Sequence, residues 1–154
     1  MNASQSYMNL VQKALACIDL ENFADALRLA HITAILKSGG PFTVFAPVNT
    51  AFLDMPASVL KLVEEEHVFL GTILQYHLVS GLYSAADLSR RGRVQSLIGE
   101  DVSIFNDNGN IILNDAKVLR SDLKASNGVI HVIDRLLLPS GLVSKDMHPL
   151  LVHC

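Results

Sequence analysis

The chain has 154 residues, of which 50% are hydrophobic and 18% are charged, and its formal net charge at pH 7 is −3. This length fits one domain, and the apolar content is enough to build a core and too high for a disordered chain. The slightly negative charge provides no basic field that would hold a polyanion, so we expect no nucleic-acid partner. No apolar run is long enough to span a bilayer, so we expect no transmembrane segment. The N-terminus lacks the basic and apolar regions of a leader peptide, so either the protein is not exported or a leader has been removed.

The first forty residues have the apolar spacing of helices. Apolar residues recur at intervals of three and four over residues 5–18, which predicts an amphipathic helix, and the period continues through residues 23–30. Residues 32–36 indicate one further short helix. The segment S-G-G-P (38–41) ends this helical region, because glycine permits a positive φ and proline cannot continue a helix.

A short strand and three helices are predicted next. The segment P-F-T-V-F-A-P (41–47) is apolar at most positions and predicts a strand. Short helices are expected at residues 50–54 and 57–66. A third helix is predicted from about residue 68 to 79, with Gly81 as its C-terminal stop.

From residue 93 onward the apolar period changes from that of helices to the period of two that is typical of strands. Turn signals such as N-D-N-G (106–109) separate these segments, which favours hairpins. The predicted strands are 94–98, 102–105, 110–113, 116–119 and 129–134. Helices followed by a strand-rich half predict an α+β fold with mostly antiparallel strands. We expect one domain over residues 1–140 and a C-terminal tail over 141–154.

Searches for catalytic and metal-binding patterns find none that is complete. There is no G-x-S-x-G elbow, no phosphate-binding glycine loop and no H-E-x-x-H pair, so we expect no catalytic residue, metal or cofactor. The only two cysteines, Cys17 and Cys154, can form a disulfide only if the C-terminus returns to the first helix, and two free thiols are the alternative. The basic cluster Arg90, Arg91 and Arg93 is either a solvated loop, which we favour, or a weak site for an anionic partner.

Three aromatic or imidazole side chains lie within apolar patterns. His131 stands in V-I-H-V-I-D (129–134), where it can be a catalytic base, a metal ligand or a hydrogen-bonded core residue, and we favour the core because buried polar groups are nearly always paired. Tyr76 and His77 belong to the helix predicted at 68–79. Each must pair its polar atoms if it is buried, at a cost of about 1–3 kcal/mol otherwise. They either pin this helix to a neighbouring segment, which we favour, or contact a ligand directly.

Three segments in register resemble the signature blocks of the fasciclin domain family. They are G-P-F-T-V-F-A-P-V-N-T-A-F (40–52), L-Q-Y-H-L-V-S-G (74–81) and A-S-N-G-V-I-H-V-I-D-R-L-L-L-P (125–139). The lead-in F-A-D-A-L-R-L-A from Phe23 is similar too, and the resemblance covers roughly residues 5–140. It implies a twisted antiparallel β-wedge with several helices packed around it, and no enzyme activity.

The resemblance also implies a function and a contact region. Fasciclin domains are mostly secreted or cell-surface modules that mediate adhesion to cells, matrix or polysaccharide. In animal members, integrin contact is assigned to an Asp-Ile pair before the closing block and to the tyrosine–histidine region. The matching residues here are Asp122 and Leu123, together with Tyr76 and His77. A turn aspartate bonded to its own backbone is the alternative for Asp122.

We therefore expect a non-enzymatic adhesion or interaction module, similar to the single-domain bacterial members. Its expected location is secreted, periplasmic or at the cell surface, and its expected state is a monomer or weak oligomer. The alternative is a carrier of a small hydrophobic ligand, a lipid or pigment, in a groove of the fold, because some fasciclin relatives hold pigments. An enzyme is the third hypothesis, and it would require His77 or His131 to reach solvent beside a nucleophile.

Overall fold

The computed structural model describes residues 18–38, 41–53 and 67–139. Several predictions fall outside these ranges: the helix over 5–18 apart from its last residue, the helix over 57–66, Cys17, Cys154 and the tail over 141–154.

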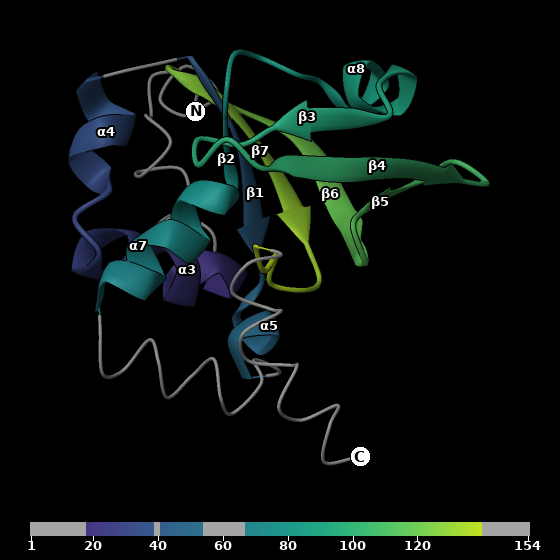
Figure 1. Cartoon of the computed structure of the whole chain (residues 1–154). Coiled ribbons are helices and arrows are strands. Elements are labelled where there is room, and N and C mark those ends of the chain that lie inside the picture. The colour runs from purple at the N-terminus through teal and green to yellow at the C-terminus, as the bar shows by residue number, and fades with distance from the viewer. Residues whose placement is uncertain (1–17, 39–40, 54–66, 140–154) are drawn as a thin grey trace, which may run out of the picture.

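The helices belong mostly to the N-terminal half of the chain (Figure 1). Within the described residues they are η1 (Ile18–Leu20), α3 (Glu21–Leu29), α4 (Thr33–Ser38), α5 (Asn49–Leu53), α7 (His67–Tyr76) and α8 (Ala85–Arg90). On α3, Phe23 and Leu27 are four residues apart and both buried, as the apolar period predicts. The short helix α8 begins with a capping box, in which Ser84 and Asp87 each accept a hydrogen bond from the other's backbone N–H.

Seven strands form one sheet in the order β2-β1-β7-β6-β5-β4-β3. They are β1 (Phe42–Pro47), β2 (Leu78–Ser80), β3 (Arg93–Gln95), β4 (Asp101–Asp107), β5 (Asn110–Leu113), β6 (Ala116–Ala125) and β7 (Gly128–Ile133). All neighbouring pairs are antiparallel except β1 and β7, which run parallel. The α+β class and the mostly antiparallel sheet predicted from the sequence are confirmed.

The neighbouring strands β1 and β7, second and third in the sheet, are buried along their whole length. They pair in register from Phe42 opposite Gly128 to Pro47 opposite Ile133. A strand covered on both faces can be apolar at consecutive positions, which is the pattern that the sequence shows in both segments. The prediction of a strand covered on two sides around His131 is therefore confirmed.

Two apolar clusters lie on the two faces of β1 and β7. The helix-side core joins α3, α4 and α7 to one face of β1 and β7, and it includes Phe23, Leu74, Val44 and Ile130. The wedge-side core lies on the other face, against β4, β5 and α8. Figure 1 shows this division, with α3, α4 and α7 on one side of β1 and the strands β3 to β5 on the other. Phe45 of β1 belongs to the wedge-side core, and so the alternation along β1 separates the two clusters.

Several of the predicted element boundaries were wrong. The strand predicted at 94–98 ends at Gln95, because the chain turns there and the N–H groups of Ser96 and Gly99 bond within residues 96–100. The helix predicted at 68–79 ends at Tyr76, because the chain turns at His77 and pairs Leu78–Ser80 with β1. The N–H of Phe45 donates to the His77 carbonyl, and this long-range bond replaces the continuation of the helix.

The strand predicted at 116–119 continues to Ala125, where the sequence had indicated a loop around Asp122. Its pairing with β7 shifts register between Val118 and Arg120 and again between Arg120 and Leu123. These bulges interrupt the alternation of apolar and polar residues, which is why a pattern of period two stops short of the true end of β6.

Candidate functional site

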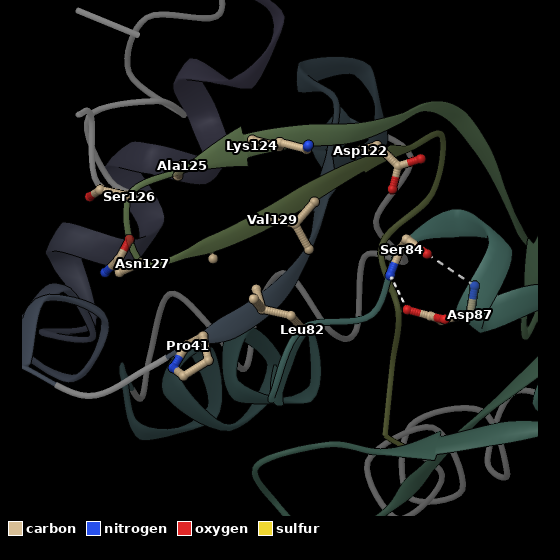
Figure 2. A pocket seen from close by; sticks show the side chains of 11 residues that line it. Pro41, Leu82, Ser84, Asp87, Asp122, Lys124, Ala125, Ser126, Asn127 and Val129 are labelled. Atoms are coloured by element: carbon tan, nitrogen blue, oxygen red, sulfur yellow. Dashed lines mark hydrogen bonds between the residues drawn. The ribbon is translucent and has the colours of Figure 1, made fainter. Parts of the chain in front are cut away.

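An open groove of about 400 Å³ lies between the β6–β7 hairpin and the connection from β2 to α8 (Figure 2). Apolar and charged side chains line it together: Pro41, Leu82, Asp87, Asp122, Lys124 and Val129. Leu82 is 57% exposed, so it contributes apolar surface that is accessible within the groove. Figure 2 shows Asp122 at the end of the groove nearest α8, beside Ser84 and Asp87. The groove therefore combines an apolar surface with an acidic end.

Asp122 has a left-handed backbone, with φ of 60°. This region costs an ordinary L-residue about 1–2 kcal/mol, and Asp and Asn tolerate it better than most. Its N–H donates to Nδ1 of His131 at 3.2 Å, and its Oδ1 accepts the N–H of Ala85 at 2.9 Å. Ala85 is 37 residues away in sequence, so the interpretation of Asp122 as a turn residue bonded to its own backbone is wrong. The contacts instead fix the carboxylate between β6 and the start of α8.

Leu123, the second member of the predicted contact pair, has a different environment. Its side chain is half-buried and packs against the helix-side core. It does not line the groove to which Asp122 belongs. Asp122 lines the groove whereas Leu123 packs on the helix-side core, and so the two side chains do not form one surface.

Tyr76 is buried at the end of α7, with 2% of its surface exposed. Its hydroxyl donates to the Asp101 carbonyl at 2.8 Å and accepts from Nδ2 of Asn114 at 3.0 Å. Burial raises the pKa of Tyr76, while the hydrogen bond from Asn114 acts in the opposite direction. The prediction that this phenol pins its helix to a neighbouring strand is confirmed.

His77 is fully buried and bonded through both ring nitrogens. The N–H of Leu137 donates to Nε2 at 2.9 Å, so Nε2 carries no proton. Nδ1 then carries the proton and donates to the Ile73 carbonyl at 2.8 Å. Burial lowers the pKa of His77 from 6.5 to about 4, and the bond to Ile73 offsets part of that shift. The ring is a neutral structural link between α7 and the segment after β7.

His131 is also fully buried, with Nε2 2.8 Å from the Tyr83 carbonyl and Nδ1 bonded to Asp122. The prediction that it is a hydrogen-bonded core residue is confirmed. The hypothesis of an enzyme required one of these imidazoles to reach solvent, and neither does. Tyr76 and His77 do not line the groove, so contact between these two side chains and a partner stays a prediction.

Sequence reasoning did not identify several residues that shape the groove. Thr43 accepts from the N–H of Tyr83 and donates to the Gly81 carbonyl, and so it holds the connection that carries Leu82. The signal for Thr43 was a polar side chain in an otherwise apolar strand. Ser84 and Asp87 had the signal S-x-x-D of a capping box. Hydrogen bonds from Ser84 lower the pKa of Asp87.

The arginines of the basic cluster that the sequence indicated are exposed, and each interacts with a neighbouring side chain. Arg90 forms an ion pair with Asp87 at 2.8 Å, and Arg93 lies 3.6 Å from a carboxylate oxygen of Asp101. The guanidinium of Arg91 lies over the ring of Tyr83, 5.0 Å from its centroid. The three side chains are solvated, as predicted, although Arg90 ends α8 and Arg93 begins β3 rather than lying in a loop. In residues 18–38, 41–53 and 67–139 no group of three or more His, Cys, Asp and Glu side chains is arranged to hold a metal ion.

Comparison with known proteins gives a consistent result. The family model of the fasciclin domain matches residues 19–139. The chain is 40% identical over 139 residues to Protein sll1483 of Synechocystis sp., a match that covers 89% of this chain and 77% of that protein. It is 30% identical over 102 residues to the cell surface glycolipoprotein MPB83 of Mycobacterium bovis, covering 66% of this chain and 46% of the relative.

A solved structure shares the fold. It is the FAS1 domain pair from the insect cell adhesion molecule fasciclin I, with a TM-score of 0.73 and 23% sequence identity. The similarity covers 91% of this chain and 52% of that one. The chain belongs to the fasciclin domain family, as its three signature segments predicted. No helix in the described part of the chain is both long and apolar enough to cross a membrane.

Proposed function

We propose that the protein is a non-enzymatic adhesion or interaction module that acts outside the cell and binds a protein of the cell surface or matrix. Membership of the fasciclin family supports this function. One structural relative is named a cell adhesion molecule, and one sequence relative is named a cell surface glycolipoprotein. These names describe those proteins, and the proposal extends their location and type of activity to this one.

The proposed contact region is the acidic end of the groove, and the observation that carries it is the conformation of Asp122. A left-handed backbone conformation at a residue other than glycine costs free energy, and such conformations are concentrated at functional sites. Oδ1 of Asp122 accepts the N–H of Ala85, and no described residue forms an ion pair with Oδ2. Oδ2 can accept a hydrogen bond from a cationic or amide group of a partner, beside the apolar surface of Leu82.

The test is the substitution Asp122→Asn, which removes the charge and keeps the shape, the acceptor for Ala85 and tolerance of a positive φ. We expect binding to a reconstituted basement-membrane matrix and to intact cells to weaken by about tenfold or more. Asp107→Asn is the matched control, because Asp107 is exposed on β4 and does not line the groove. Equal binding by both variants would show that the charge of Asp122 does not contact the partner. Loss of binding after enzymatic removal of matrix polysaccharide would instead identify a polysaccharide partner.

A second candidate function is transport of a small hydrophobic ligand. Its support is the size of the groove, about 400 Å³, within the range of about 300–1,000 Å³ typical of ligand pockets. Pro41, Leu82 and Val129 supply its apolar lining. Organic extraction of the purified protein followed by mass spectrometry should recover a lipid or pigment in stoichiometric amount if this function is correct. Extracts without such a compound, from protein that binds matrix, would favour the adhesion module.

A further inference from the structure

A buried side chain, that of His131, bonds to both sides of the groove. His131, on β7, is bonded to Asp122 of β6 through Nδ1 and to the Tyr83 carbonyl of the β2–α8 connection through Nε2, at 3.2 and 2.8 Å. The first partner belongs to the β6–β7 hairpin side and the second to the side that carries Leu82 and Ser84. The ring is therefore one of the links between the two sides, beside the bond from the N–H of Ala85 to Asp122.

The partners of His131 determine which nitrogen carries its proton. A backbone N–H can only donate, so Nδ1 must accept from Asp122. A carbonyl can only accept, so Nε2 must carry the proton and donate to Tyr83. Only the neutral ring protonated on Nε2 satisfies both bonds, because an imidazolium would direct a second N–H at the N–H of Asp122.

The bond to Nδ1 supports a backbone that is unfavourable by itself. Asp122 lies at a register shift with φ of 60°, and its N–H points into the fold at the ring. The same conformation directs Oδ1 to the N–H of Ala85. If Nδ1 of His131 no longer accepts from the N–H of Asp122, the backbone of Asp122 can shift, and the position of its carboxylate shifts with it.

We propose that His131 is a positioning residue of the binding surface: its neutral ring holds the Asp122 carboxylate in the groove, and protonation of the ring releases that carboxylate and weakens partner binding. This inference rests on the proposed contact role of Asp122, whose regulation it describes. His131 itself does not touch the partner, because its side chain is fully buried.

The groups that face the ring determine the direction of the pH effect. Asp122 from β6 is the charged group, Tyr83 contributes its carbonyl, and the Phe45 ring of β1 lies 6.2 Å away, centroid to centroid. Burial lowers the pKa of His131 below 6.5, while the bond to Tyr83 and the charge of Asp122 oppose this shift. Once Nδ1 is protonated it needs an acceptor, and we infer that the Asp122 carboxylate, the charged group that acts on the ring, supplies one. Turning inward to the ring removes this carboxylate from Ala85 and from the groove.

Two substitutions separate the two bonds of the ring at similar structural cost. His131→Asn keeps an acceptor at the position of Nδ1 and cannot titrate, whereas His131→Gln keeps a donor at the position of Nε2 and leaves Asp122 without its acceptor. We expect His131→Asn to bind the basement-membrane matrix as the parent does at about pH 7.5 and to keep that affinity at about pH 5. The parent should bind progressively more weakly as the pH falls below 6.5 and its ring takes up a proton. His131→Gln should bind about tenfold more weakly at both values.

A second measurement does not depend on any partner. The amide resonances of Asp122 and Ala85 in ¹⁵N-labelled protein should shift together as the pH is lowered in the parent, following titration of the His131 ring nitrogens, and should stay fixed in His131→Asn. Identical amide titrations in the two proteins, or full binding by His131→Gln, would overturn the inference. If no protein binds matrix at any pH while the amides of the parent titrate as expected, the proposed function fails and the positioning role of His131 stands.

Discussion

Two buried imidazoles, His77 and His131, connect different parts of the molecule, and they do so with opposite tautomers. His77 carries its proton on Nδ1 and joins α7 to Leu137 within the apolar interior, 6.2 Å from the ring of Phe23. His131 carries its proton on Nε2 and joins the two sides of an open groove. Both rings are neutral and fully buried, yet only one has bonded partners that lie at a surface.

The difference shows that burial of a histidine does not decide what it does. The partners of His77, Ile73 and Leu137, are backbone groups of the interior, so loss of that ring affects the stability of the whole domain. The partners of His131 belong to residues at or beside the groove, so loss of that ring affects the shape of the site as well. Separate measurements of stability and of binding therefore distinguish the two regions.

The largest effect is expected from His77→Ala. This change leaves the buried N–H of Leu137 without an acceptor and opens a cavity beside Phe23, which together should lower the free energy of unfolding by about 4 kcal/mol. Urea unfolding measures the loss. The fraction that remains folded should still bind matrix with parental affinity, and weaker binding by that fraction would show that the two regions are coupled.

The next effect is a pH dependence of stability that comes from His77. Its pKa is about 4 in the folded protein and 6.5 in the unfolded chain, so the unfolded chain takes up the proton first as the pH falls. Stability is therefore lost between pH 6.5 and 4, by about 3 kcal/mol at the lower end. His77→Gln keeps an acceptor for Leu137 and does not titrate, so its unfolding free energy should fall less steeply over this window. Parallel curves for the two proteins would show that the pKa of His77 is unshifted.

The smallest effect is expected from Leu123→Ala. The side chain is half-buried against the helix-side core, so truncation should cost about 1 kcal/mol of stability. Binding by the folded variant should equal that of the parent, because Leu123 does not line the groove. A variant that folds with parental stability and binds weakly would show instead that Leu123 contacts the partner.

Much of the fold was predictable because the relevant signals are local. The change from helical period to period two indicated the α+β class, and consecutive apolar residues in V-I-H-V-I-D indicated a strand covered on both faces. The boundaries that failed are those where a distant segment decides the structure. His77 leaves the helical pattern because Phe45 bonds to its carbonyl, and the true end of β6 is hidden by bulges that have no periodic signal.

The candidate site was predictable only in part, for the same reason. The resemblance to the family indicated Asp122, Leu123, Tyr76 and His77 as contact residues, and the apolar pattern indicated His131 as a paired core residue. The sequence could not show that Leu123 packs on the helix-side core or that Ala85 bonds to Asp122, because both contacts join distant segments.

By itself, the sequence determined the family, the order of helices and strands and the burial of His131, because these depend on apolar spacing and on motifs read along one chain. Only the tertiary structure decided that Asp122 and Leu123 have different environments, that the carboxylate of Asp122 is bonded to Ala85, and which nitrogen of each buried imidazole carries the proton. The physical reason is that hydrogen-bond partners at a bulge or in a core come from segments far apart in sequence, and their donor or acceptor character sets the state of the side chain between them.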